Sequence, residues 1–136
     1  MIETAEEFVY LRSSDEAALY SRAASETAPE HVWQEVIQKY PEMRKWVVHN
    51  KTVPHKILAE LAADDDPSVR HAVAIKRKLD QSIFKQLAND VDESVRLAVA
   101  LNPKTPQNIL KNLTNDPWER ISEVARQRID LESRQR

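Results

Sequence analysis

The histidines of this sequence are the first candidates for chemistry, because histidine is the residue that most often binds zinc or moves protons near neutral pH. There are four of them, His31, His49, His55 and His71. No pair has the H-x-x-x-H or H-E-x-x-H spacing that places two imidazoles on one face of a helix. His49, His55 and His71 come from adjoining turns and can converge in space, but the spacing favours solvated histidines over a zinc site.

Carboxylates and serines are the remaining candidates for a metal site or a catalytic group. The run Asp64–Asp66 lacks the glycine and the distal glutamate of an EF-hand calcium loop. Asp66 precedes Pro67, a typical start of a helix, so a capping role accounts for it better. A Ser–His–Asp triad assembles in space and leaves no fixed spacing, but no serine here is marked as a nucleophile. We therefore expect no catalytic residues, no metal and no cofactor.

The composition excludes several classes of site. The chain has 136 residues, with no cysteine and no glycine. Disulfides, iron–sulfur clusters and thiolate zinc sites need cysteine, whereas phosphate-binding loops, dinucleotide fingerprints and nucleophile elbows need glycine. The N-terminus carries acids instead of the bases and apolar run of a signal peptide, and no segment is long and apolar enough to span a bilayer. We expect a cytoplasmic protein without membrane contact.

An internal repeat dictates the elements that must position any site. The segments 56–74 and 82–100 align at an offset of 26 residues, with apolar residues on apolar residues throughout. Ile57, Ile83 and Ile109 share one position of this repeat. Each repeat has a first helix with apolar residues at i, i+1 and i+4. After an acidic turn comes a second helix with apolar residues at i, i+3 and i+4. Such a period is typical of stacked helical units that share one continuous core.

The repeat also predicts how the chain is divided. Residues 1–26 do not match it and are expected to form N-terminal capping helices. The first repeat is divergent and one residue shorter than the others. We predict an all-α fold in a single domain, a right-handed α-solenoid of about four helix-pair repeats. These repeats are expected at about 27–50, 51–76, 77–102 and 103–132, within residues 27–136.

Two segments carry a resemblance to a known repeat family. They are NPKTPQNILKNLTND (Asn102–Asp116) and NKTVPHKILAELAADDDPSVRHAVA (Asn50–Ala74). Both are similar to HEAT-like repeats, in particular to the variant leucine-rich repeat, and the likeness spans roughly residues 27–125. Small bacterial proteins that resemble this chain are often immunity proteins, which block a toxin made by the same cell. The resemblance therefore implies an α-solenoid and, by association, toxin neutralisation.

The resemblance also implies a role for two kinds of charged residue. In HEAT-like repeats an aspartate in the turn and an arginine six residues later form a ladder between neighbouring units. Asp64 with Arg70 and Asp90 with Arg96 match this pattern. Ser122 replaces the arginine that would follow Asp116, so the ladder is expected to end there.

Two surfaces are candidates for binding a partner. Residues next to the core stripe of the second helices are expected to face outward and, with an exposed Leu97, to form a partly apolar row that fits a protein. The alternative is a slightly rotated helix that buries Leu97. The loops between repeats are basic, which complements the helix dipoles or forms a binding edge. Trp118 is either a cap contact or an interface anchor. The candidate partner-binding residues are Arg44, Lys45, Val48, Arg70, His71, Ala74, Leu97, Ala100, Lys76, Arg77, Lys78 and Trp118.

The function expected from these features is non-catalytic binding of one protein partner by a chain that is monomeric when free. Its most concrete form is a bacterial immunity protein that binds and neutralises a cognate toxin domain. Nucleic-acid binding is the alternative, and a generic scaffold or regulatory subunit is a third possibility. The nucleic-acid alternative would use the basic edge formed by Lys51, Lys76, Arg77, Lys78 and Lys104.

Overall fold

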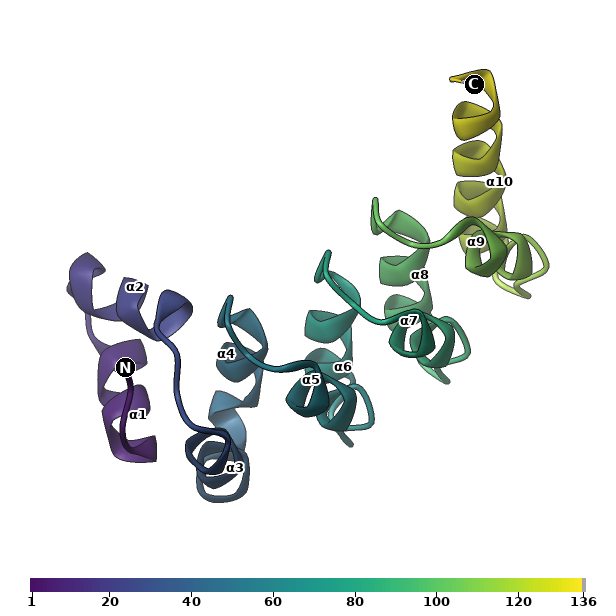
Figure 1. The fold of residues 1–136 in the computed structure, drawn as a ribbon. Coiled ribbons are helices and arrows are strands. Elements are labelled where there is room, and N and C mark those ends of the chain that lie inside the picture. Colours follow the sequence, from purple (N-terminus) through teal and green to yellow (C-terminus); the bar gives the residue numbers. More distant parts are fainter. Residues whose placement is uncertain (136) are drawn as a thin grey trace. The chain divides into compact units, whose positions relative to one another are not determined.

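The computed structural model describes residues 1–135, and every regular element in that range is a helix (Figure 1). Ten α-helices and one short 3-10 helix account for these elements, which confirms the predicted all-α class. None of the described helices combines the length and the apolar character needed to cross a bilayer. The chain forms two compact units, Met1–Asp64 and the residues from Asp65 onward. The boundary falls inside the predicted repeat 51–76, and the assignment of one domain stays a prediction.

In the first unit, the helices pack against their neighbours in sequence and also against helices further along the chain. Helix α1 packs against α2 and α3, and α4 packs against α2, α3 and α5. Phe8 and Trp33 lie at the centre of this unit, both buried, with their rings edge to face and their centroids 5.3 Å apart. The elements are α1 (Ala5–Ser13), α2 (Ala17–Ser25), α3 (Glu30–Lys39), η1 (Pro41–Met43), α4 (Arg44–His49) and α5 (His55–Leu61).

The second unit places alternate helices in contact. Helix α6 packs against α8 and α8 against α10, while α7 packs against α9. Helices α7 and α9 also pack against the helices that follow them, so the second helices form one row and the first helices another. The elements are α6 (Pro67–Ala74), α7 (Gln81–Ala88), α8 (Glu93–Leu101), α9 (Gln107–Leu113) and α10 (Glu119–Arg134).

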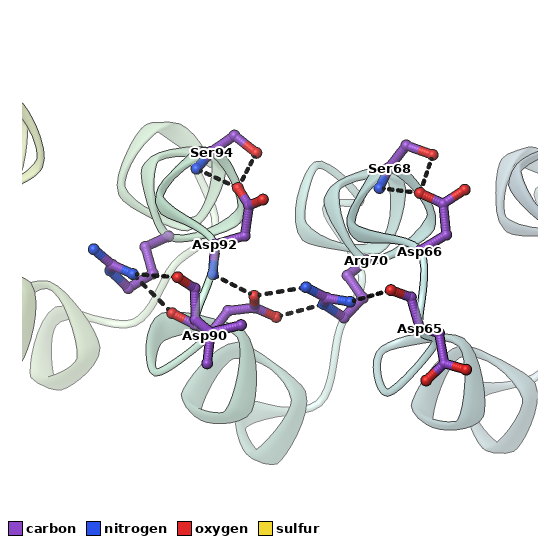
Figure 2. Close-up of polar contacts among 9 residues, drawn as sticks. Asp65, Asp66, Ser68, Arg70, Asp90, Asp92 and Ser94 are labelled. Carbon is purple, nitrogen blue, oxygen red and sulfur yellow. Dashed lines mark hydrogen bonds and ion pairs between the residues drawn. The ribbon is translucent and has the colours of Figure 1, made fainter.

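Local signals in the sequence explain where the helices begin. Pro29, Pro54 and Pro106 occupy the N-cap positions of α3, α5 and α9, where the missing N–H costs nothing. Asp66 and Asp92 cap α6 and α8, each accepting a 2.8 Å hydrogen bond from the backbone N–H of the serine two residues later (Figure 2). Hydrogen bonds from the side chain and backbone of that serine, Ser94, lower the pKa of Asp92. Each predicted repeat thus contains two helices.

The aligned apolar positions form the cores of the two units. Ile57 is fully buried, and Ile83 and Ile109 are 97–98 % buried, since only 3 % and 2 % of their surfaces are exposed. The leucines at the position four residues later, among them Leu87, are buried as well. Most of these helices have only seven to ten residues, too few to be stable in isolation, so this burial holds them in place.

Arginine–aspartate pairs recur at one spacing in both units. Arg44 binds Asp64 in the first unit through Nη1 at 3.0 Å. In the second unit Arg70 binds Asp90 through Nε at 2.8 Å (Figure 2). Arg96 binds Asp116 through Nε at the same distance. Each arginine therefore pairs with the aspartate 20 residues later. The pair of Arg44 with Asp64 is an additional member of the ladder, because the resemblance to HEAT-like repeats pointed to Arg70 and Arg96 only.

The ladder ends where the sequence departs from the pattern. Asp116, the last aspartate, is engaged by Arg96. At the next arginine position Ser122 is buried, and its hydroxyl donates to the carbonyl of Glu119 within the same helix. No arginine is therefore left to continue the series at this point of α10.

A second ladder joins buried or half-buried polar side chains to backbone carbonyls. In the first unit the Asn50 amide donates to the carbonyls of Ala23 and Glu26 at 2.8 and 2.9 Å. In the second unit the Asn102 amide donates to the carbonyls of Ala74 and Lys76 at 2.8 and 2.7 Å. Arg128, 26 residues after Asn102, donates to the carbonyls of Ala100 and Asn102 in the same way. The contact of Asn50 shows that α2 stands in the place of a preceding second helix, although residues 1–26 do not match the repeat.

Candidate functional site

The strongest candidate site is a hollow of about 310 Å³ on the second unit, between α6 and α8. Its wall is formed by Ile75, Leu97 and Leu101, together with Ala98. Ile75 and Leu101 have 48 % and 53 % of their surfaces exposed, an unusual state for large aliphatic residues side by side on a small unit. The complete lining is His71, Ile75, Arg77, Ser94, Leu97, Ala98, Leu101, Asn102 and Pro103.

Helical periodicity explains why these side chains meet. On α8 the lining residues Ser94, Leu97, Ala98 and Leu101 follow the i, i+3, i+4, i+7 spacing of one helix face. Helix α8 packs against α6, so this face of α8 lies beside the last turn of α6 and Ile75, its C-cap residue. The hollow therefore lies along the row of second helices, the surface that the sequence favoured for binding.

The charge around the hollow has one sign. Arg77 belongs to the lining, and no aspartate or glutamate does. Lys78 is exposed one residue further, and Lys104 is exposed next to Pro103. These three cations form no ion pair with the described residues, in contrast to Arg44, Arg70 and Arg96. His71 is the second basic side chain of the lining beside Arg77.

Lys76, between the apolar and basic parts of this region, is half-buried. Burial lowers the pKa of its ammonium group by removing part of its hydration. Its backbone carbonyl accepts from the Asn102 amide, so the segment before Arg77 is fixed by the second ladder. Lys76 is therefore part of the packed structure as well as of the predicted basic edge.

The structure brings together three of the predicted binding residues and separates others. Leu97 and His71 are half-buried and line the hollow with Arg77. Trp118 lies at the N-cap of α10 with 37 % of its surface exposed, and it does not line the hollow. Lys45 is exposed on α4 in the first unit.

The prediction that Val48, Ala74 and Ala100 face outward is wrong. Val48, Ala74 and Ala100 are completely buried. The physical reason is the number of neighbours that each second helix has. Helix α8, for example, packs against α6, α7 and α10, which covers more of its circumference than the single core stripe assumed from the sequence.

The role expected for two arginines also needs correction. Arg44 and Arg70 were predicted to flank a binding surface, but their guanidinium groups are engaged within the chain. Arg44 donates to Asp64 and to the carbonyl of Ile37, and Arg70 donates to Asp90 and to the carbonyl of Asp65 (Figure 2). Both side chains are therefore structural members of the ladder.

Sequence reasoning missed Ile75 and Leu101, the two most exposed aliphatic residues of the hollow. A signal was present, because they lie 26 residues apart at the end of successive second helices. At that position a solvated helix end normally carries polar or basic residues. The equivalent residue of the first repeat is His49.

The corresponding hollow of the first unit differs in chemistry. It has about 240 Å³ and lies beside Trp46 and His49, whose rings are 5.3 Å apart. The Arg12 guanidinium lies over the Trp46 ring at 3.4 Å from its centroid. Trp46 is thus covered from within the unit, whereas the aliphatic wall between α6 and α8 stays exposed.

A further hollow of about 330 Å³ lies between α7 and α9, and it contains Arg96 with Asp90 and Asp116. Arg96 pairs with Asp116 and donates to the backbone carbonyl of Asp90, whose carboxylate pairs with Arg70. Within residues 1–135 no three histidine or carboxylate side chains are placed to hold a metal ion. Asp64 and Asp66 instead bind Arg44 and cap α6.

A scan against protein-family models and searches of curated proteins and of solved structures gave no significant match to this chain.

Proposed function

We propose that this chain is a non-catalytic protein-binding α-solenoid whose binding surface is the row of second helices. The observation that carries the proposal is the aliphatic wall of the hollow between α6 and α8, in which Ile75 and Leu101 are exposed and Leu97 is half-buried. Exposed aliphatic residues around a concave surface, rimmed by charge, are typical of protein-interaction sites. Alternate packing of first and second helices in the second unit, and the recurring ladders, support a repeat architecture for this surface.

The concrete form of the proposal is an immunity protein that neutralises a cognate toxin. Its support is the resemblance to small HEAT-like bacterial proteins and a surface that is preformed by packed helices. A preformed surface avoids the ordering cost that a flexible binder pays on association. The unpaired cations at the rim would speed encounter with an acidic patch on the toxin.

The experiment that tests protein binding uses a photo-crosslinking amino acid at position 97 in cells that naturally produce the chain. A probe at Leu131, exposed on α10, is the control. The partner captured at position 97 is then purified, and its Kd is measured by calorimetry for the wild type, Leu97→Asp and Leu131→Asp. We expect at least a tenfold weakening for Leu97→Asp and less than twofold for Leu131→Asp. Equal affinities of all three proteins would contradict the proposed surface.

The immunity form has its own test. If the gene directly upstream encodes a toxin, co-expression with the wild-type chain should restore growth, and Leu97→Asp should abolish the protection. Growth arrest that persists with the wild-type chain would contradict the immunity form while leaving protein binding intact.

Nucleic-acid binding is the second candidate, favoured by the exposure of Arg77, Lys78 and Lys104 without ion pairs in the described residues. Neutralising phosphates releases counterions, so such binding would fall steeply between about 50 and 200 mM salt. Filter binding of a labelled oligonucleotide across this range tests it. Absence of binding at low salt would remove this candidate.

A further inference from the structure

The hollow between α6 and α8 combines two chemistries at close range. Its wall is aliphatic, and Arg77 in its lining adds a positive charge. Lys78 and Lys104 are exposed at positions next to the lining residues Arg77 and Pro103, and none of these three cations has an ion pair among the described residues. In the arginine–aspartate ladder, by contrast, Arg44, Arg70 and Arg96 are each matched by an aspartate within the chain. A partner that fits this region must therefore supply both an apolar group and negative charge.

The size of the hollow limits the apolar group. Its volume of about 310 Å³ lies at the lower end of the range of about 300–1,000 Å³ found for small-molecule sites. Because it is open to solvent on one side, it suits one bulky side chain presented by a protein segment. The lining contains no phenylalanine, tyrosine or tryptophan, and His71 is its one aromatic side chain.

The buried amide of the hollow, that of Asn102, is already satisfied, which favours an apolar insert. The Asn102 side chain donates to the carbonyls of Ala74 and Lys76 and accepts from the backbone N–H of Lys104 at 2.9 Å. No buried side-chain nitrogen or oxygen in the described residues lacks a hydrogen-bond partner. A polar side chain inserted here would therefore form few new hydrogen bonds, whereas an apolar side chain would remove the aliphatic wall and itself from water, which is favourable.

We propose that the hollow binds an acidic segment of a partner protein that inserts one leucine or phenylalanine between Ile75, Leu97 and Leu101. Its flanking carboxylates face Arg77, Lys78 and Lys104. This inference rests on the proposed protein-binding function and adds the chemistry of the partner. Cations that flank an apolar pocket give both the affinity and the choice of an acidic over a basic segment.

The experiment uses the full chain labelled with ¹⁵N and three nine-residue peptides. The first has a central phenylalanine flanked on both sides by glutamates, the second has serine in place of phenylalanine, and the third has lysines in place of glutamates. We expect the first peptide to give saturable amide shifts at Ile75, Leu97 and Leu101. The second should bind at least tenfold more weakly, and the third should give no shifts at these residues.

Matched variants test the two chemistries separately. Leu101→Asp is compared with Leu131→Asp, because 53 % and 55 % of these leucines are exposed. Arg77→Glu with Lys78→Glu is compared with the exposed pair Lys111→Glu with Arg120→Glu. We expect at least tenfold weaker binding of the first peptide by Leu101→Asp and by the Arg77/Lys78 variant. Both controls should stay within twofold of the wild type, and an amide spectrum of each variant verifies that it is folded.

The outcomes separate this inference from the proposed function. Equal binding of the phenylalanine and serine peptides, or unchanged binding by Leu101→Asp, overturns the inference. If no peptide binds but the partner crosslinked at position 97 loses affinity with Leu101→Asp, protein binding holds and the acidic-segment inference fails. If a single-stranded oligonucleotide of equal charge shifts the same amides and no peptide does, both proposals fail in favour of nucleic acid.

Discussion

Arg70 and Asp90 are joined by two hydrogen bonds of 2.8 and 3.1 Å in a largely buried setting, where only 13 % and 8 % of their side chains are exposed. The Asp90 carboxylate also accepts from the backbone N–H of Asp92 at 2.9 Å (Figure 2). One carboxylate therefore fixes the turn before α8 and links it to α6. Since the same arrangement recurs at Arg96 and Asp116, the ladder sets how each turn meets the preceding second helix.

Removing Arg70 should destabilise the chain strongly. Arg70→Ala leaves the nearly buried Asp90 carboxylate without its cation, and we expect the free energy of unfolding to fall by about 3 kcal/mol. Urea denaturation followed by circular dichroism measures this. Arg134→Ala is the control, because its ion pair with Asp130 is long and exposed and should contribute less than about 0.5 kcal/mol. A loss below about 1 kcal/mol for Arg70→Ala would show that the ladder is not structural.

Asn102→Asp should be less stable than the wild type at neutral pH, and this difference in the free energy of unfolding should shrink as the pH falls. At neutral pH the new carboxylate would face the carbonyls of Ala74 and Lys76, and we expect a loss of about 3 kcal/mol. These oxygens and burial raise the pKa of the new carboxyl above its ordinary value of about 3.9. As pH falls through that raised pKa, the folded chain binds a proton before the unfolded chain does, so the loss shrinks.

Urea unfolding of Asn102→Asp at pH 7 and near pH 4, each relative to the wild type, measures this change. Asn108→Asp, at an exposed position in the first turn of α9, is the control and should show no comparable loss. A loss for Asn102→Asp that is the same at both pH values would contradict the buried amide ladder.

Lys76 should make stability rise with alkaline pH. Burial lowers the pKa of its ammonium in the folded chain, whereas the unfolded chain keeps a value of about 10.4. Between these two values the unfolded chain binds a proton that the folded chain lacks, so the free energy of unfolding rises with pH. Lys76→Met lacks this titration, and the stability of the wild type relative to the variant should increase across that window. Parallel profiles of the two proteins would refute this, and Lys111→Met, at an exposed lysine, should be parallel to the wild type.

Leu87→Ala tests the shared core. Leu87 is completely buried, so its truncation should cost about 2–5 kcal/mol of the free energy of unfolding. Val91→Ala, four residues later, removes a side chain that is 91 % exposed and should change stability by less than about 0.5 kcal/mol. Similar denaturant midpoints for the two variants would mean that the 26-residue alignment does not report a core.

The apolar repeat predicted the all-α class, because burial imposes a strict period on residues such as Ile57, Ile83 and Ile109. The outward face of the second helices was harder to predict. A sequence gives the width of the core stripe only when the number of packing neighbours is known. Ala74 and Ala100 have small side chains that suit either a closely packed interface or a solvent-exposed position, and in the structure both are buried.

The candidate site could be predicted only in part for a related reason. Leu97, His71 and Arg77 stood out by type and position. Ile75 is the C-cap residue of α6 and Leu101 the last residue of α8, and in the sequence both resemble ordinary helix ends. Arg44 and Arg70 could be binding or structural residues until their partners 20 residues later were located. The residue types thus indicated which side chains are able to bind a partner. Which of them are already paired within the chain could be seen only in the structure.

The hydrogen bonds donated by Asn102 and Arg128 have a consequence for how such a chain can change in length. Each reaches back to the same pair of carbonyls in the preceding segment, and an amide and a guanidinium serve equally well. Gain or loss of one whole 26-residue segment would therefore leave every donor opposite an acceptor, while a single inserted residue would strand several of them. Duplication and deletion of complete segments is the route by which a gene for this chain can grow or shrink without unfolding its product.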